Sequence, residues 1–311
     1  MKKQLLAVAF TAMTAAGVFA QTVDTVAKVK ASGTITLGVR ESSGALSYMI
    51  GDGKYAGFQV DVCHRIVSDL ERTLGTKLDV RYQPVTSQNR IPLVLNGTVD
   101  LECGSTTNNL TRQKEVAFAV TTYVEEVRVA VKANSGIESL SQLGGKVIVT
   151  TTGTTSVQLL RKHNRTAELK FKDVLSGKDM ADSFLLLESG RADAFVMDSQ
   201  VLAGNIATSR SPADYRIVGE PISIEPIAIM LRRDDPAFKK VVDNTIRELI
   251  KTGELAKMYD RWFMQPIPPK NVKLNVPASA ATRAAWADPN DKPLESYVCS
   301  PPSCVPPAPG Q

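Results

Sequence analysis

The sequence lacks the basic runs, nucleotide-binding loops and clustered metal ligands that identify several large classes of protein. Its net charge of +5 is spread over 311 residues, and the basic pairs Arg232-Arg233 and Lys239-Lys240 have acidic neighbours. This pattern does not favour nucleic-acid binding. Gly51-Asp-Gly53 is not a dinucleotide fingerprint, and no Gly-Lys-Ser/Thr follows Gly153, so the sequence shows no phosphate loop.

Histidine and cysteine are scarce, with two and four residues. His64 stands beside Cys63, but no further ligand follows at a metal-binding spacing, so we expect no zinc site and no cofactor. The four cysteines, Cys63, Cys103, Cys299 and Cys304, allow three disulfide pairings. The close pair, Cys299 and Cys304, most simply closes on itself, which would leave Cys63 to join Cys103. Two buried free thiols are the alternative for that second pair.

The longest apolar run lies at the N-terminus. Lys2 and Lys3 precede a mostly apolar stretch from Leu5 to Phe19, and Val18-Phe19-Ala20 resembles a small-residue cleavage site. This is the pattern of a secretory signal peptide, and the stretch is too short for a membrane-spanning helix. A membrane anchor is the alternative. We predict that residues 1–20 are removed and that the remaining chain is exported in soluble form, without a lipid anchor because no cysteine lies at the cleavage point.

Hydrophobic residues make up 43% of the chain, and their spacing alternates between that of strands and that of helices. The alternating run 34–39 predicts a strand, and apolar positions at helical spacing predict a helix over 57–74. Strands alternating with helices indicate parallel α/β sheets. This alternation of strands and helices occurs twice, before and after about residue 128, which predicts two similar lobes. From residue 266 the chain is rich in proline and alanine, and we expect an irregular or loosely attached tail.

The remaining elements are predicted from the same patterns. Ser87 is the expected N-cap of a short helix that ends near Gly97. Further strands are predicted at 78–82, 99–103, 127–131, 146–150, 194–197, 217–219 and 228–231, and further helices at 91–95, 154–163, 182–190, 236–252 and 253–263.

Polar side chains follow four of these strands at the point where each strand ends. They are Arg40, Ser105, the run Thr152 to Thr155, and Asp198. In open α/β sheets ligands bind beyond the carboxyl ends of the strands. With two such ends in each lobe, we expect these residues to meet at one mouth between the lobes.

The chemistry of these residues suits a small zwitterion with two carboxylates. The guanidinium groups of Arg40, Arg90 and Arg112 are natural partners for carboxylates, whereas a single arginine taken alone is more often a solvated surface residue. The turn 151–156 ends a strand and opens a helix, which favours an anion or is an ordinary cap. Asp198 is the acid we expect to hold an ammonium group, or to cap a helix. No nucleophile accompanies them, so the sequence points to capture without a reaction.

Several runs of the sequence resemble the family 3 solute-binding proteins of ABC transporters, and among them the members that bind glutamate and aspartate. The likeness extends over nearly all of the chain from the predicted cleavage site to about residue 295. It is carried by Gly38-Val-Arg-Glu-Ser-Ser43, Thr86-Ser-Gln-Asn-Arg-Ile-Pro-Leu93, Glu102-Cys-Gly-Ser-Thr-Thr-Asn-Asn109, Ser189-Gly-Arg191 with Met197-Asp198, and Pro266-Ile-Pro-Pro-Lys-Asn271.

The resemblance implies a type II periplasmic binding protein fold, an α/β fold with two lobes joined by two crossover strands and a ligand cleft between them. Lobe 1 would comprise residues 27–128 and 227–275, lobe 2 residues 129–226, and the C-terminal tail 276–311. It also implies a periplasmic, monomeric protein that closes on its ligand and delivers it to an inner-membrane permease.

Residue roles follow from the resemblance as well. Arg112, Thr107 and Thr155 would hold the α-carboxylate, and Ser105 with Asp198 the α-ammonium. Arg40, Ser87 and Arg90 would hold the side-chain carboxylate. Met180 stands where the glutamate- and aspartate-binding members have a histidine, and a thioether cannot donate a hydrogen bond.

Three other functions compete with capture of an acidic amino acid. A neutral ligand such as glutamine or asparagine fits the loss of a donor at Met180. The same fold resembles cyclohexadienyl dehydratases, for which Glu41 or Glu102 would supply the acid. A receptor's sensor domain is the third, but no transmembrane segment follows the fold. We therefore expect a binding protein and not an enzyme.

Overall fold

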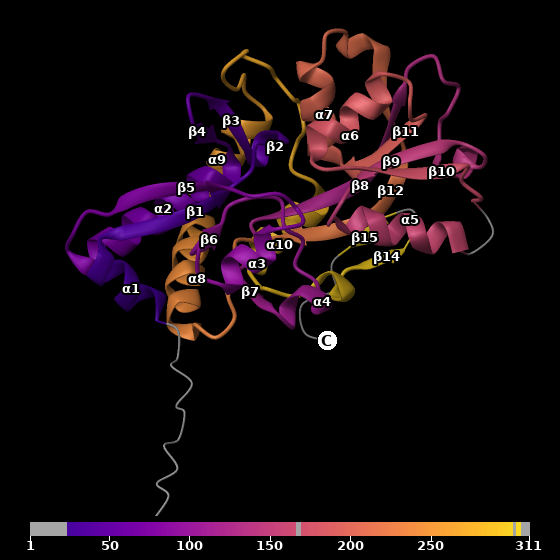
Figure 1. Cartoon of the computed structure of the whole chain (residues 1–311). Helices are drawn as coiled ribbons and strands as arrows, with labels where there is room; N and C mark the ends of the chain where they lie inside the picture. The colour runs from indigo at the N-terminus through magenta and orange to yellow at the C-terminus, as the bar shows by residue number, and fades with distance from the viewer. Residues whose placement is uncertain (1–23, 166–168, 301–302, 306–311) are drawn as a thin grey trace, which may run out of the picture.

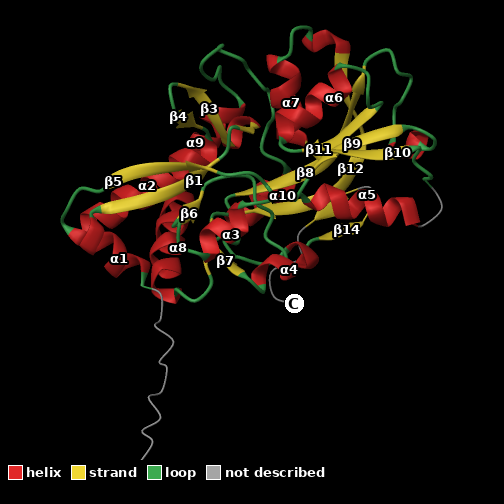
Figure 2. Cartoon of the chain, in the orientation of Figure 1, coloured by secondary structure: helices red, strands yellow, loops and turns green. Residues whose placement is uncertain are grey.

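The computed structural model describes residues 24–165, 169–300 and 303–305, and it shows two lobes, each built on one five-stranded sheet (Figures 1 and 2). The predicted signal peptide lies outside the described residues. The strand–helix alternation read from the sequence is confirmed in both lobes. The sheets are mixed, however, because one strand of each, Met230–Arg232 in lobe 1 and Tyr123–Lys132 in lobe 2, runs antiparallel to both of its neighbours.

The first sheet has the strand order β5-β1-β6-β13-β7 and forms lobe 1 with its helices. β1 is parallel to β5 and β6, whereas β13 is antiparallel to β6 and β7. The elements of lobe 1 are α1 (Thr25–Ser32), β1 (Thr34–Val39), β2 (Ser42–Ser43), η1 (Gly44–Leu46), β3 (Ser47–Gly51), β4 (Lys54–Ala56), α2 (Phe58–Leu74), β5 (Asp79–Pro84), α3 (Arg90–Leu95), β6 (Leu101–Glu102), α4 (Leu110–Gln113), β7 (Val116–Phe118), β13 (Met230–Arg232), α8 (Pro236–Lys251) and α9 (Glu254–Phe263).

The second sheet has the strand order β10-β9-β11-β8-β12 and forms lobe 2. β9 is parallel to β10 and β11, and β8 is antiparallel to β11 and β12. Its elements are β8 (Tyr123–Lys132), η2 (Leu140–Leu143), β9 (Val147–Thr151), α5 (Thr155–Arg165), β10 (Asp173–Gly177), α6 (Met180–Glu188), β11 (Ala194–Asp198), α7 (Ser199–Thr208), η3 (Pro212–Asp214) and β12 (Tyr215–Ile227).

Two long strands, β8 and β12, connect the lobes. Tyr123 and Ile227 pack in the core of lobe 1, whereas Val127 and Val218 pack in a core of lobe 2. Between these points the strands pair directly, with Glu125 opposite Glu225. β12 is therefore much longer than the predicted strand 217–219. The prediction fell short because Pro226 and the polar residues near it interrupt the apolar pattern that identifies a strand.

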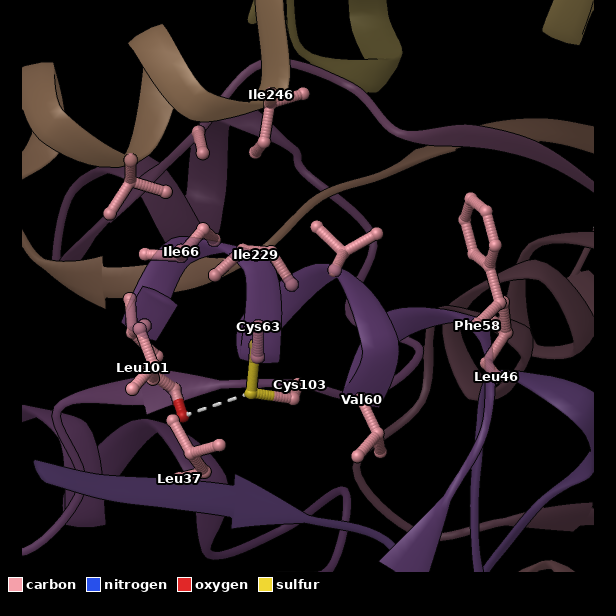
Figure 3. Close-up of a cluster of buried hydrophobic side chains, with 14 of the residues drawn as sticks. Leu37, Leu46, Phe58, Val60, Cys63, Ile66, Leu101, Cys103, Ile229 and Ile246 are labelled. Carbon is pink, nitrogen blue, oxygen red and sulfur yellow. Dashed lines mark hydrogen bonds between the residues drawn. A yellow bond between two sulfur atoms is a disulfide. The ribbon is translucent and has the colours of Figure 1, made fainter. Parts of the chain in front are cut away.

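The largest core lies in lobe 1, between its sheet and helices α2, α8 and α9. α2 buries one face, with apolar side chains at helical spacing, and ends at Gly75 in the left-handed conformation. Figure 3 shows the disulfide between Cys63 of α2 and Cys103, which follows β6, inside this core. The sequence separation is 40 residues, and in the chain-entropy model such a link contributes about 4 kcal/mol. The predicted pairing of these two cysteines is confirmed.

In its described part the C-terminal segment forms a helix that packs against the connecting strands, contrary to the expectation of an irregular or loosely attached tail. α10 (Ala280–Ala287) buries Ala281 and Ala285 against Val124 and Ile224, and Trp286 Nε1 donates to Thr122 O at 2.8 Å. Its alanines form a helix because alanine is the best helix former and fits a close contact. The chain continues through η4 (Leu294–Ser296) to β14 (Val298–Ser300) and β15 (Ser303–Val305).

Cys299 and Cys304 lie opposite each other in the β14–β15 pairing. The side chains of both residues lie outside the described part of the structure, so their disulfide stays a prediction.

Candidate functional site

The residues that the sequence singled out meet at the boundary between the lobes. Arg40 directly follows β1 and Arg90 opens α3, and each side chain is 2% exposed. Arg40 Nη2 donates to Ser87 Oγ at 2.8 Å. Ser87 is thus an acceptor for Arg40 and not the predicted N-cap of α3, because Asn89 occupies the cap position and exchanges hydrogen bonds with Thr86.

These two arginines form a buried, positively charged end of the site, which we call the distal end. Among the described residues Arg40 Nη1 and Arg90 Nε and Nη1 have no hydrogen-bond partner. Burial, with the neighbouring charge of Arg90, lowers the pKa of Arg40 to about 10, and burial also lowers the pKa of Arg90. Buried guanidinium donors without partners are costly. An anion at this end would supply acceptors to both side chains.

Met180 and two serines from different segments adjoin one another between the lobes. Met180 opens α6 of lobe 2 and is 1% exposed. Ser43 of lobe 1 donates from Oγ to Met180 Sδ at 3.4 Å and lies 3.2 Å from Ser105 Oγ. Ser43 was not predicted as a site residue, because a serine in a polar turn carries no pattern that distinguishes it from a surface residue.

Arg112 lies at the opposite end of the site, which we call the amino-acid end. It belongs to the short helix α4, and its Nη1 donates to Thr107 O at 2.8 Å. Its Nη2 donates to Gly153 O of lobe 2 at 3.3 Å, so this side chain joins the two lobes. Burial, and then the charge of Arg90, lowers the pKa of Arg112 to about 9. The positive charge therefore lies in a site largely shielded from water.

Glu225 is a buried acid at this end that the sequence analysis missed. Its Oε2 accepts from Thr107 Oγ1 of lobe 1 at 2.6 Å and from Thr155 Oγ1 of lobe 2 at 2.7 Å. In the sequence, Ser223 and Glu225 alternate with Ile222 and Ile224. Polar residues in such an alternation normally form the solvent-facing side of a strand, so the pattern suggests that Glu225 is exposed. That face turns out to be the inter-lobe boundary.

Asp198 ends β11 and is 2% exposed. It occupies the N-cap position of α7 but makes no side-chain cap hydrogen bond, so the predicted capping role is absent. Burial, with Glu125 and then Glu225 as neighbouring charges, raises the pKa of Asp198 well above its ordinary value. A cation beside these acids would relieve their mutual repulsion.

Glu125 serves the structure of lobe 2. Its Oε1 accepts from Ser199 N and Oγ at 3.1 and 2.6 Å, at the start of α7, and from Glu126 N at 2.9 Å. Burial raises its pKa to about 7. Glu225 is the residue directly opposite Glu125 in the antiparallel pairing of β8 and β12.

The lobes touch on both sides of the site. A Cβ added at Gly204 of α7 would lie 3.1 Å from Gly44 Cα, and one added at Gly153 would lie 2.8 Å from Ser87 C. Beside the second contact a hollow of about 760 Å³ separates the lobes. It is lined by Gln88, Asn109, Thr111 and Arg112 from lobe 1 and by Thr152, Gly153, Thr154, Thr155, Val157, Gln158, Arg161 and Ser176 from lobe 2.

The two acids considered for an enzyme differ in position. Glu41 is exposed, whereas Glu102 is buried and its Oε2 accepts from Thr106 Oγ1 at 2.6 Å. No group of three or more potential metal ligands occurs within the described ranges. In that same part of the chain, no helix is both long and apolar enough to cross a membrane.

Comparison with known proteins gives the site a context. The model of the bacterial extracellular solute-binding proteins, family 3, matches residues 35–265. The chain is 45% identical over 271 residues to a glutamate/aspartate import solute-binding protein of Escherichia coli strain K12, covering 87% of this chain and 89% of that protein. It is also 45% identical over 273 residues to an L-glutamate/L-aspartate-binding protein of Pseudomonas aeruginosa strain PAO1, covering 87% and 90%.

A solved structure shares the arrangement of the lobes. It is an ancestral arginine-binding protein bound to arginine, 29% identical, with a TM-score of 0.66 and coverage of 74% of this chain and 98% of that one.

Proposed function

Because the chain belongs to the bacterial extracellular solute-binding proteins of family 3, we propose that it captures an acidic amino acid, glutamate or aspartate, for an ABC transporter. Its fold is the two-lobed type II fold of periplasmic binding proteins, as the sequence resemblance implied. The observation that carries the proposal is the distal end. Two buried arginines there offer guanidinium donors that have no partner among the residues the structure describes, and a side-chain carboxylate matches such donors in charge and geometry.

The remaining residues divide between the two ends of the ligand. Arg40, Ser87 and Arg90 hold the side-chain carboxylate, and Arg112 with the backbone N–H groups of Thr107 and Thr155 holds the α-carboxylate. Asp198 and Ser105 hold the α-ammonium. Met180 lies beside the distal end. The two 45% identical relatives support the ligand class, because their names describe import or binding of glutamate and aspartate.

Capture proceeds by closure of the lobes, which we assign to residues 27–128 with 227–275 and to 129–226. The ligand first meets the three arginines of lobe 1, and lobe 2 then brings Thr155 and Asp198. A ligand shifts the open–closed equilibrium only by the contacts that it makes better in the closed form. The closed, monomeric protein then delivers its ligand from the periplasm to an inner-membrane permease.

Met180 keeps a second candidate ligand in view. A thioether supplies no hydrogen-bond donor to a carboxylate. A neutral ligand side chain, such as that of glutamine or asparagine, therefore loses less binding free energy at Met180 than an acidic one does. The buried, unpaired arginine donors favour the acid nevertheless, because an amide has one acceptor oxygen where a carboxylate has two. Catalysis is not part of the proposal, since the 45% identical relatives are named as binding proteins.

A thermal-shift screen of the twenty amino acids tests this function. We expect L-glutamate and L-aspartate to raise the melting temperature most, because a ligand that binds the folded state stabilises it in proportion to log affinity. Stabilisation by L-glutamine or L-asparagine alone would overturn the proposed ligand. Conversion of prephenate or arogenate by the protein would instead support the dehydratase-like enzyme.

A further inference from the structure

Glu225 is placed to decide which chemical groups the amino-acid end accepts. The residue is fully buried, and it lies where β12 crosses between the lobes. Its partner in the strand pairing, Glu125, turns its hydrogen bonds to the start of α7 within lobe 2. Glu225 instead contacts one threonine from each lobe. The two opposed acids therefore have different roles.

The contacts of Glu225 fix the direction of two threonine hydroxyls. Thr107 Oγ1 and Thr155 Oγ1 lie 2.6 and 2.7 Å from the same atom, Glu225 Oε2. An ionised carboxylate only accepts, and a hydroxyl has a single hydrogen to donate. Both hydrogens are thus engaged with Glu225, and each hydroxyl retains only lone pairs for a ligand. Two side chains that would otherwise be donors become acceptors.

The second oxygen of Glu225 adds a further acceptor. Glu225 Oε1 is buried and has no hydrogen-bond partner among the described residues. Asp198 lies within its electrostatic reach, since the pKa of Asp198 is raised by burial, by Glu125 and by Glu225. A buried carboxylate oxygen without a donor costs free energy. A donor that carries positive charge would satisfy Oε1 and Asp198 together.

Donors at this end come from other groups. Arg112 retains guanidinium hydrogens beyond its two bonds to backbone carbonyls. The backbone N–H groups of the first turn of α5 add to them, because a helix leaves its first four N–H groups unpaired. The α-carboxylate therefore depends on Arg112 and on the backbone, and not on the hydroxyl hydrogens of the two threonines.

Building on the proposed function, we propose that Glu225 is a specificity-determining residue that obliges the ligand to carry a free α-ammonium group. It does so by turning Thr107 and Thr155 into acceptors and by offering Oε1 as a further buried acceptor at the same end of the site. A dicarboxylate of the same length without an amine leaves all of these acceptors unpaired. Glu225 thereby separates acidic amino acids from simple dicarboxylic acids.

Calorimetric titration with L-glutamate and with glutarate, which is glutamate without its amine, tests this role. In the wild type we expect glutarate to bind at least about 1,000-fold more weakly, because unpaired buried polar groups reject an analogue strongly. Glu225→Gln should weaken binding of L-glutamate by about 30-fold and leave binding of glutarate unchanged or tighter. The ratio of the L-glutamate affinity to the glutarate affinity should therefore shrink at least tenfold. Glu126→Gln, one position along β8 from Glu125 and in a residue that pairs with Arg128 at 3.3 Å, is the control and should preserve the wild-type ratio.

Thr155→Val provides a second variant, because it removes one of the redirected hydroxyls at nearly constant volume. We expect it to weaken L-glutamate more than glutarate. Equal weakening of the binding of both ligands in Glu225→Gln and in Thr155→Val would show a structural role only and would overturn the inference.

Failure of the proposed function and failure of this inference give different results. If the wild type binds no acidic amino acid, the proposed function fails first. If it binds L-glutamate and the affinity ratio stays constant in both variants, only the role of Glu225 fails.

Discussion

The two ends of the inter-lobe site differ in how their buried charges are balanced. At the amino-acid end, Arg112, Asp198 and Glu225 mix both signs, and Arg112 and Glu225 already make hydrogen bonds within the protein. At the distal end, Arg40 and Arg90 lie together with guanidinium nitrogens that have no partner in the described chain. On the proposed function, the amino-acid end closes on the zwitterion of the ligand, and the distal end selects its side chain by charge.

The largest effect is expected from breaking the amino-acid end. Arg112→Ala leaves the α-carboxylate of L-glutamate without its guanidinium in a buried site and removes the contact to Gly153 O. Breaking a buried charge pair by removing one partner costs about 3–5 kcal/mol, so we expect a loss of affinity of about 150-fold or more by calorimetry. The exposed Arg72→Ala is the control. Unchanged affinity in Arg112→Ala would contradict the assignment.

Removing a charge from the distal end should change the choice of ligand. In Arg90→Gln, L-glutamate loses a charge-assisted pair, and we expect about 100-fold weaker binding, or about 2.7 kcal/mol. L-glutamine carries no side-chain charge, and its affinity for the variant should fall by less than about fivefold. Competition titrations of both ligands measure the two changes. A parallel loss for glutamate and glutamine would show that Arg90 does not read the side-chain charge.

Ionisation of the buried Glu125 on crossover strand β8 makes the stability of the folded protein depend on pH. Burial raises the pKa of Glu125 to about 7 from an ordinary 4.5. The folded protein therefore holds this proton where the unfolded chain releases it, and stability falls as pH rises from 4.5 through 7. At about 1.4 kcal/mol for each pKa unit, the loss is on the order of 3 kcal/mol.

Glu125→Gln removes this titration while keeping an acceptor oxygen for Ser199. We expect the variant to unfold at higher urea concentration than the wild type at pH 8, and at a similar concentration at pH 4.5. A constant difference between the two proteins across this range would contradict the raised pKa.

Both ends of the site depend on contact between the lobes, which Gly204→Ala tests. Alanine favours the helical conformation over glycine by about 1 kcal/mol, so the open, ligand-free protein should be stabilised. In the closed form its Cβ would lie 3.1 Å from Gly44 Cα, and we expect about fivefold weaker L-glutamate binding. Thermal unfolding and calorimetry check the two parts. A variant that binds at least as tightly as the wild type would show that this contact does not limit closure.

The smallest effect is expected at Met180. Met180→His places a donor where Ser43 now contacts the thioether, and we expect about threefold tighter L-glutamate binding at pH 6 than in the wild type. The gain should shrink at pH 8, where an ordinary imidazole is neutral. Met49→His, at an exposed position, controls for an added histidine. A gain of equal size at both pH values would exclude a charged imidazole as its cause.

The difference between the ends also explains what could be predicted from the sequence. The sequence could predict that Arg40 and Asp198 lie at the inter-lobe boundary, because Arg40 follows a regular strand and Asp198 ends one, and strand ends meet at one edge of a sheet. Glu225 and Ser43 were missed because nothing in their local pattern separates a residue facing a cleft from one facing water. The ordered tail was missed for a related reason: α10 is stabilised by packing on the crossover strands, which composition alone does not reveal.

The central claim is that the closed site selects an acidic side chain. Calorimetric titration of the wild-type protein with L-glutamate and L-glutamine under the same conditions tests it most directly. The account predicts that L-glutamate binds at least about 100-fold more tightly, since only its side chain pairs with the two buried arginines as an anion. Equal affinity for the two ligands, or tighter binding of L-glutamine, would contradict it.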